Sequence, residues 1–345
     1  MAFKRSSNWR DLAAAELMTK VLRKVELAGD VLVMLEGRPE VAVAAKRSGA
    51  RARSWHRMTL TDRPGSAWPP AGPFDAATLR LPRAKDELHM SVHAMAVSLR
   101  AGARMWLYGA RDEGVRSARP FLEPLFEEVS TVSIGSRCRV LGAVRSSVST
   151  GLKGVLSDWT RVTRVMMPDS PREWTSYPGV FAHGKVDAGT SALFEVVSSL
   201  PKGGRVLDFA CGSGLIGAAV ASSDPSASVE FLDADAVALE AVSRNVPDAH
   251  VILSDGYAGV AGRPYDVIVS NPPYHDGKAE SGRMLERLVT GAPRHLKPGG
   301  ALVFVTQRRL RVESLLKSTF AVTEIVLDRG LYRVWRGELG DGEVT

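Results

Sequence analysis

The sequence has no run of about 18 consecutive apolar residues, so we expect no membrane-spanning helix. The amino terminus, residues 1–10, is polar and basic and lacks the apolar core of a secretion signal. Two cysteines, Cys138 and Cys211, are too few for a disulfide framework or a metal cluster. These absences favour a cytoplasmic protein without a metal ion.

A glycine-rich loop is missing from the first half of the chain, although strand and helix patterns alternate there. An α/β domain without such a loop is better suited to holding a partner than to reacting with it. The patterns predict strands at 31–35, 78–81, 105–108, 129–134 and 139–144, and helices at 9–27, 85–99 and 114–128, the last interrupted by prolines.

Negative charge is also scarce in the first half. Residues up to Val165 carry 27 Lys and Arg against 16 Asp and Glu, whereas the remainder carries 18 against 22, within a net charge of +7. A positive field attracts polyanions, of which nucleic acid is the commonest, although basic surfaces often serve solubility alone. Charge by itself leaves the two explanations about equal.

The densest basic run extends from Lys46 to Arg57 and interleaves Trp55 with the cations. Its composition suits phosphate contacts and base stacking, but Trp55 itself is expected in the core. The residues expected to contact phosphate are Lys46, Arg47, Arg51, Arg53 and Arg57.

The second half predicts a doubly wound parallel sheet more clearly. Five strand-helix units are followed by two final strands, 322–328 and 331–336, which predicts a seven-stranded mixed sheet that ends in an antiparallel hairpin. An irregular stretch with Pro168, Pro171 and Pro178 precedes it. We therefore expect a basic domain at 1–165, a linker at 166–185 and a catalytic domain at 186–345.

The first strand of the second domain runs into Gly212-Ser-Gly-Leu-Ile-Gly217, which fits the G-x-G-x-x-G pattern of nucleotide-binding loops. A dehydrogenase would show the same pattern. S-adenosylmethionine fits better, because Asp208 would repel a pyrophosphate but can meet a cationic amino-acid group. Asp233 stands where a ribose-binding acid belongs, and Asp255 follows a third strand where it could receive the adenine amino group.

The fourth strand ends at Asn271-Pro-Pro-Tyr274, where two prolines stop it. An asparagine carbonyl can accept a hydrogen bond from a planar amino group, the backbone carbonyl of Pro272 can accept a second, and Tyr274 can stack on a base. Alone, the tetrapeptide could also be an ordinary proline-rich turn.

These motifs together resemble class I methyltransferases that modify planar amino groups. The strings Val186-Asp-Ala-Gly-Thr190, Ser270-Asn-Pro-Pro-Tyr-His-Asp-Gly277 and His295-Leu-Lys-Pro-Gly-Gly300 are similar to the bacterial ribosomal RNA guanine-N2 methyltransferases, and the length is nearest to the small-subunit type. The resemblance implies an α/β fold of two tandem doubly wound, Rossmann-like methyltransferase domains, of which the first is degenerate and binds no cofactor.

The resemblance also implies a set of site residues. The expected cofactor contacts are Asp208, Ala210, Gly212, Gly214, Asp233, Ala234, Asp255, Gly256 and Asn271. The expected catalytic residues are Asn271, Pro272 and Tyr274, and Phe181 and His275 join the basic run as substrate contacts. Two departures from the usual family pattern are Ala210 in place of glycine and Tyr274 in place of phenylalanine.

The expected activity is methyl transfer from S-adenosylmethionine to a guanine N2 amine of ribosomal RNA, most simply 16S RNA in the small subunit, by a monomer. Two alternatives stay open. A protein glutamine methyltransferase also uses Asn-Pro-Pro-Tyr, although its amino-terminal domain is a helical bundle rather than basic α/β. The other is a silent RNA-binding assembly factor that keeps the fold. A dehydrogenase is more distant.

Overall fold

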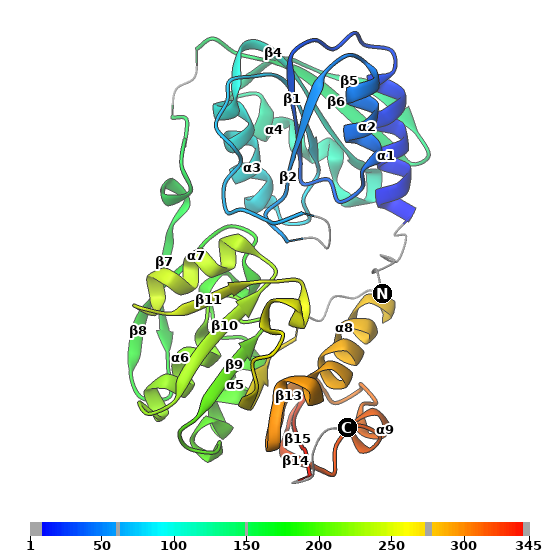
Figure 1. The fold of residues 1–345 in the computed structure, drawn as a ribbon. Coiled ribbons are helices and arrows are strands. Elements are labelled where there is room, and N and C mark those ends of the chain that lie inside the picture. Colours follow the sequence, from blue (N-terminus) through cyan, green and yellow to red (C-terminus); the bar gives the residue numbers. More distant parts are fainter. Residues whose placement is uncertain (1–8, 60–62, 149–150, 273–277, 341–345) are drawn as a thin grey trace. The chain divides into compact units, whose positions relative to one another are not determined.

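The computed structural model describes residues 9–59, 63–148, 151–272 and 278–340 (Figure 1). Its contacts divide the chain into two compact units, 1–160 and 161–345. Each unit contains its own sheet, and each is described by itself below. No helix in the described ranges is both long enough and apolar enough to cross a membrane.

The described strands of the first unit form a six-stranded sheet in the order β2-β1-β3-β4-β6-β5. Strands β1 to β4 are parallel, whereas β6 and β5 are antiparallel to their neighbours. In chain order the elements are α1 (Trp9–Leu22), β1 (Asp30–Met34), α2 (Glu40–Arg47), β2 (Arg51–Trp55), β3 (Phe74–Arg80), α3 (Lys85–Ser98), β4 (Leu99–Ala110), α4 (Arg119–Leu122), β5 (Phe126–Gly135) and β6 (Cys138–Arg145). The helix expected at 114–128 is short, because Pro124 cannot continue α4.

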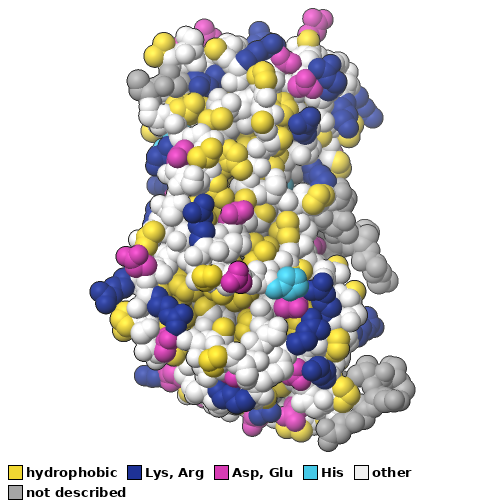
Figure 2. All heavy atoms as spheres, turned by 60° about the vertical axis from the view of Figure 1, so that its left-hand side comes forward, with side chains coloured by type: hydrophobic (Ala, Val, Ile, Leu, Met, Phe, Trp, Pro, Cys, Tyr) yellow, Lys and Arg dark blue, Asp and Glu magenta, His cyan; other side chains and the backbone are white. Residues whose placement is uncertain are grey.

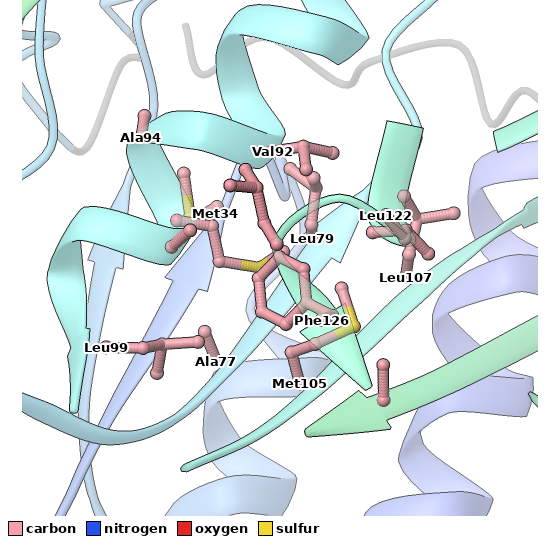
Figure 3. Packing of buried hydrophobic residues seen from close by; sticks show 14 of the residues in the cluster. Met34, Ala77, Leu79, Val92, Ala94, Leu99, Met105, Leu107, Leu122 and Phe126 are labelled. Carbon is pink, nitrogen blue, oxygen red and sulfur yellow. The ribbon is translucent and has the colours of Figure 1, made fainter. Parts of the chain in front are cut away.

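Apolar side chains of this sheet fill two layers, one on each face. Alternate residues of a strand point to opposite faces, so Val31 and Val33 pack with α1 and α2 while Leu32 and Met34 pack with α3. Figure 3 shows the α3 layer, in which side chains from the strands meet those of the helices around Phe126. Burial on both faces explains why these strands are apolar runs without a polar alternation.

Charged and polar side chains fill the carboxyl end of the first sheet. Glu36 is buried there and accepts a hydrogen bond from the Tyr108 hydroxyl at 2.7 Å. The buried guanidinium of Arg80 donates to Asp11 at 2.9 Å and to Glu113 at 2.8 Å. The protein's own charged side chains thus occupy the carboxyl end of this sheet, where a cofactor would bind in an open α/β fold.

Seven of the described strands of the second unit form one sheet in the order β11-β10-β9-β12-β13-β15-β14, and β7 and β8 form a separate two-stranded sheet. Strand β15 is antiparallel to both β13 and β14, so the sheet ends in the expected antiparallel hairpin. The elements are β7 (Arg161–Met166), β8 (Pro171–Ser176), η4 (Phe181–Gly184), α5 (Ala188–Val196), β9 (Arg205–Phe209), α6 (Leu215–Ser223), β10 (Ser228–Asp233), α7 (Ala236–Asn245), β11 (His250–Leu253), η6 (Gly256–Val260), β12 (Tyr265–Ser270), α8 (Lys278–Gly291), η7 (Ala292–His295), β13 (Leu296–Gln307), α9 (Glu313–Lys317), β14 (Val322–Arg329) and β15 (Tyr332–Glu338).

The two sheets share one topology, which confirms the tandem methyltransferase-like fold. The order β2-β1-β3-β4-β6-β5 repeats as β10-β9-β12-β13-β15-β14, with β11 added at the edge. The first strand of each sheet is also followed by a non-glycine residue at positive φ, Leu35 at 56° and Ala210 at 57°. A non-glycine residue rarely adopts this conformation, so its recurrence indicates that both loops start with the same turn.

Residues 166–185 do not form a linker between the two units. The bounds that the sequence predicted for the linker and for the start of the second domain are therefore wrong. Strands β7 and β8 form an antiparallel hairpin that belongs to the second unit. Val165 and Trp174 on its inner face are buried with α5 and α6 in the core of that unit. The prolines that suggested a linker lie before, within and after β8, and Pro171 pairs with Met166 at the start of the strand.

Candidate functional site

The glycine loop between β9 and α6 is built from left-handed residues. Ala210, Gly212 and Gly214 have φ values of 57°, 54° and 87°. Gly214 precedes the first turn of α6, so the helix amino terminus follows the loop directly. A Cβ at Gly212 would meet no described atom within 4 Å, which leaves open space beside the loop. Backbone N–H groups at such a helix start favour negatively charged or polar ligand groups.

Asp208 lies at the end of β9 and is fully buried. Its Oδ2 accepts a hydrogen bond from the Gly217 amide at 2.8 Å, whereas Oδ1 has no hydrogen-bond partner among the residues that the structure describes. Burial, together with the nearby charge of Asp233, raises the pKa of Asp208 to about 7. A buried carboxylate oxygen without a donor suits a cationic or hydrogen-bonding ligand group.

Asp233 ends the neighbouring strand β10 and holds the loop in place. Its Oδ2 accepts from the Gly212 amide at 2.8 Å, and its Oδ1 accepts from the Asp235 amide at 2.9 Å. Burial and the adjacent charge of Asp235 raise the pKa of Asp233 to about 6. A carboxylate oxygen can accept more than one hydrogen bond, so both oxygens can still accept from ribose hydroxyls. Asp208 and Asp233 therefore fit S-adenosylmethionine.

Asp255 follows β11 and forms an ion pair with Arg287 of α8, whose Nη1 lies 3.2 Å from Oδ1. Gly256 comes next, with φ of 71°. A Cβ at Gly256 would lie 2.9 Å from Nη2 of Arg287, so the glycine gives the guanidinium room. Arg287 and its pairing with Asp255 were not expected from the sequence.

Asn271 follows β12, which pairs with β9 in register Val269 to Asp208. The Ser270 hydroxyl donates to the Phe209 carbonyl at 2.7 Å and so ties the two strand ends together. The Asn271 side chain donates through Nδ2 to Asp187 and to Thr190, both at 3.1 Å. Its Oδ1 is therefore the atom left to accept a hydrogen bond. Pro272 beside it is buried.

Either Asp187 or Thr190 could cap the helix that starts here in the sequence, and the structure shows Asp187 in that place. It is the N-cap of α5 and accepts from the amides of Thr190 and Gly189 at 3.0 and 3.3 Å. Its second contact, with Asn271, was missed. The string Val186-Asp-Ala-Gly-Thr190 marks this segment as part of the family resemblance, but no rule of sequence spacing connects residue 187 with residue 271.

Two further residues that the sequence reasoning missed fasten the β7–β8 hairpin to the glycine loop. The Trp174 indole donates to the Ser213 hydroxyl at 3.0 Å. Asn245 of α7 accepts from the Thr175 amide at 2.7 Å and donates to the carbonyls of Thr175 and Ser213 at 2.9 and 3.1 Å. The hairpin is thus a structural support of the loop.

The expected substrate contacts fall into three groups. Lys46, Arg47, Arg51 and Arg53 are exposed on α2 and β2, and Phe181 is 48% exposed on η4. Tyr274 and His275 lie outside the described residues. Arg57 is 3% exposed and its guanidinium pairs with Glu87 at 3.4 Å, so its assignment as a phosphate contact is wrong. Trp55 is buried as expected and donates to Ser66.

Part of the basic run lines a surface hollow of about 510 Å³. Its residues are Asp30, Lys46, Ala50, Arg51, Ala52 and Arg53. Arg51 and Arg53 alternate with smaller residues along the edge strand β2, and Arg51 also pairs with Asp30 at 2.7 Å. Figure 2 shows one face of the molecule, on which Lys and Arg side chains are scattered among acidic ones.

Two family models match the chain. The "Methyltransferase small domain" covers residues 172–336, and the "Methyltransferase small domain N-terminal" covers residues 39–161. Ribosomal RNA small subunit methyltransferase C of Stutzerimonas stutzeri is 31% identical over 334 residues, which are 93% of this chain and 98% of the relative. The protein of the same name from Pseudomonas fluorescens is 31% identical over 332 residues, again 93% and 98%.

The chain belongs to the ribosomal RNA small subunit methyltransferase C family. A solved structure described as the T. thermophilus 16S rRNA N2 guanine-1207 methyltransferase with AdoMet and guanosine shares the fold. Its TM-score is 0.81 at 22% identity, covering 94% of this chain and 91% of that one. Membership of the methyltransferase C family confirms the resemblance noted in the motifs, and nothing in these comparisons favours the glutamine methyltransferase, the dehydrogenase or the silent factor.

A methyltransferase of this family uses S-adenosylmethionine, and the raised pKa values of Asp208 and Asp233 lead us to expect that the affinity for the cofactor depends on pH. A cationic amino-acid group needs an ionised carboxylate, and Asp208, with a pKa of about 7, becomes neutral as the pH falls below 7. The ionised fraction of such a group falls roughly 25-fold between pH 7.5 and pH 5.5, so we expect the Kd to rise by roughly 10- to 25-fold over this range. Calorimetric titration at both pH values measures it.

The control for this pH dependence is Asp208→Asn, which keeps an acceptor for the Gly217 amide but has no titrating group. This variant should bind the cofactor weakly at both pH values and with a smaller change between them. A wild-type Kd that stays constant from pH 5.5 to 7.5 would contradict the role of Asp208 as the carboxylate that meets the cation.

Proposed function

We propose that the protein transfers a methyl group to the exocyclic N2 amine of a guanine in 16S ribosomal RNA within the cytoplasmic small subunit. The observation that carries this proposal is the Asn271 carboxamide, whose oxygen is left to accept from an amine while its NH₂ is engaged at 3.1 Å on two partners. The names of the relatives support a small-subunit RNA substrate, and the T. thermophilus enzyme is named for N2 of guanine 1207.

The cofactor supplies a methyl group on a positively charged sulfur. The amine lone pair forms the new N–C bond, the S–C electron pair stays on sulfur, and one amine proton leaves to solvent. Because positive charge builds on the nitrogen, acceptors aimed at its hydrogens stabilise the transition state. We assign Asn271 Oδ1 and the Pro272 carbonyl to the two N–H groups, and Tyr274 to stacking on the base. No strong base is needed before transfer.

Within this proposal, each acidic residue at the carboxyl end of the sheet binds a different part of the cofactor. Asp208 faces the amino-acid group, because its Oδ1 is buried and lacks a donor within the described chain. Asp233 faces the ribose, and Asp255 with Gly256 faces the adenine. We assign Ala210, Gly212, Gly214 and Ala234 to the backbone beside the ligand, and Phe181 and His275 to contact with the substrate.

Transfer of labelled methyl tests the proposed function. The wild-type protein is incubated with labelled S-adenosylmethionine and with naked 16S RNA, 30S particles, 50S particles or total protein, and the product is digested to nucleosides. Label in N2-methylguanosine from 16S RNA or 30S particles is the expected result. Label in protein, or none despite cofactor binding, would refute the proposal, and the naked-RNA and 30S arms show which form of the RNA is the substrate.

The basic strand β2 and the end of α2 are proposed as phosphate-binding elements. Reversing the charge of Lys46, Arg51 and Arg53 together should weaken RNA binding and reduce the slope of log K against log salt by roughly 0.7–0.9 for each phosphate that is no longer neutralised. The measurement is a binding titration at three or more salt concentrations. Arg137→Glu and Arg139→Glu on β6 and its turn reverse exposed or half-exposed charges elsewhere in the same unit and serve as controls.

An unchanged salt slope in the triple variant would remove β2 from the RNA-binding surface. An equal loss of affinity in the control variants would show that only the net charge of the unit matters. Arg57 is excluded from the series, because reversing a buried, paired charge would destabilise the unit itself.

A further inference from the structure

The Asn271 side chain has both donor hydrogens engaged within the protein. Its Nδ2 lies 3.1 Å from Asp187 Oδ1 and 3.1 Å from Thr190 Oγ1. A carboxylate can only accept hydrogen bonds, so the NH₂ end must be the one that faces Asp187. The contact to Asp187 therefore selects one of the two possible orientations of the carboxamide, the one that presents Oδ1 as an acceptor.

Asp187 is itself held in place by α5. Its carboxylate accepts hydrogen bonds from the amides of Thr190 and Gly189. The first turn of the helix therefore fixes both carboxylate oxygens independently of Asn271. Gly189 completes the arrangement. A Cβ at this position would lie 3.0 Å from Asn271 Oδ1 and 3.2 Å from Nδ2, so the carboxamide packs directly on the glycine.

We infer that Asp187 and Thr190 are positioning residues that orient the Asn271 carboxamide toward the attacking amine. The inference rests on the proposed function, because it assumes that Asn271 Oδ1 accepts from the amine. Hydrogen bonds that the NH₂ group donates polarise the amide, and this polarisation is strongest when the acceptor is a carboxylate. Asp187 thus increases the negative character of Oδ1 at the point where positive charge develops on the substrate nitrogen.

The structure offers a direct measure of this orientation that does not depend on turnover. The chain contains only three asparagines, Asn8, Asn245 and Asn271. Selective labelling with ¹⁵N-asparagine therefore gives three pairs of side-chain amide signals, and Asn271→Asp assigns its pair by removal. Asn245, whose NH₂ donates to Thr175 and Ser213, is an internal reference for an engaged carboxamide.

Thr190→Val removes one acceptor while preserving the shape of the side chain, and Thr190→Ser restores the hydroxyl. In wild type and Thr190→Ser, we expect the NH₂ protons of both Asn271 and Asn245 to exchange slowly with water. In Thr190→Val, we expect exchange of the Asn271 protons to accelerate at least tenfold while those of Asn245 stay unchanged. Equal exchange in all three proteins would overturn the inference.

Kinetics provide the second readout. Thr190→Val should lower kcat by roughly tenfold, because the acceptor oxygen is no longer held in line, while the Kd for S-adenosylmethionine stays within about twofold. Thr190→Ser should recover the rate. Thr319→Val is the matched control, because its hydroxyl donates to the Leu315 carbonyl at 2.7 Å near α9 and does not contact Asn271.

Asp187→Asn separates charge from geometry. Asparagine is a good N-cap, so α5 is retained, but the carboxylate that polarises Asn271 is lost. We expect a lower kcat with an unchanged melting temperature and cofactor Kd. A kcat equal to wild type would show that the charge of Asp187 has no part in the reaction and would overturn that step of the inference.

The failure of this inference can be told apart from failure of the proposed function. If wild-type protein methylates no guanine, the proposed function fails, and the exchange experiment still decides whether Asp187 and Thr190 orient Asn271. If guanine is methylated but Thr190→Val exchanges and reacts like wild type, the positioning inference fails while the function stands.

Discussion

Asn271→Ala is expected to reduce kcat for methyl transfer by roughly 10²–10³-fold, the cost of deleting one preorganised transition-state contact. The physical reason is that the amine lone pair is delocalised into the base, and the acceptor at Oδ1 both aligns it and stabilises the charge that builds on nitrogen. The variant should still bind S-adenosylmethionine with a Kd near that of wild type. Single-turnover methylation and calorimetry measure the two quantities separately.

Two comparisons sharpen this experiment. Asn271→Asp is nearly isosteric, but its carboxylate would face the Asp187 carboxylate, so we expect the substitution to impair positioning as well. Ser270→Ala is the control at the adjacent position, because it removes the hydrogen bond to the Phe209 carbonyl without touching the amine acceptor. A single-turnover rate in Asn271→Ala equal to that of wild type would disprove the catalytic assignment.

The fold of the second unit could be predicted from the sequence because its local signals agree. Apolar β-branched runs, a glycine loop and regular helix patterns all indicated the same doubly wound sheet, and the structure contains its seven strands in that arrangement. The first unit was predicted as an α/β domain for similar reasons. In place of a glycine loop after its first strand, this unit has the buried Glu36 with its Tyr108 contact, and Arg80 pairs with Asp11.

What the sequence could not reveal is the set of contacts between distant residues. Asp187 and Asn271 are separated by 84 positions, and no periodicity relates them. Arg57 was misassigned because a basic run was read as one exposed surface, whereas the chain turns after β2 and buries this residue against Glu87 of α3. Residues 166–185 were predicted as a linker because of their prolines, although this stretch contains β8 of the β7–β8 hairpin, which buries Val165 and Trp174 in the core.

Asp233→Ala should raise the Kd for S-adenosylmethionine by roughly 10- to 150-fold, since a hydrogen bond to a charged group contributes about 1.5–3 kcal/mol. The expected kcat at saturating cofactor is close to that of wild type, because Asp233 does not contact the amine. Asp224→Ala is the control, because this half-exposed aspartate accepts from Gly203 and Ser226 in the turns that precede β9 and β10. Calorimetry of both variants measures the difference.

The Asp233 carboxylate also holds the Gly212 amide at 2.8 Å, so the loss of affinity could come from a loosened loop and not from the ribose. A cofactor analogue without ribose hydroxyls separates the two causes. If Asp233 binds the hydroxyls, wild type should favour the natural cofactor over the analogue, and Asp233→Ala should bind the two almost equally. If the variant keeps the full preference, Asp233 acts only on the loop, and the ribose contact must belong to another residue.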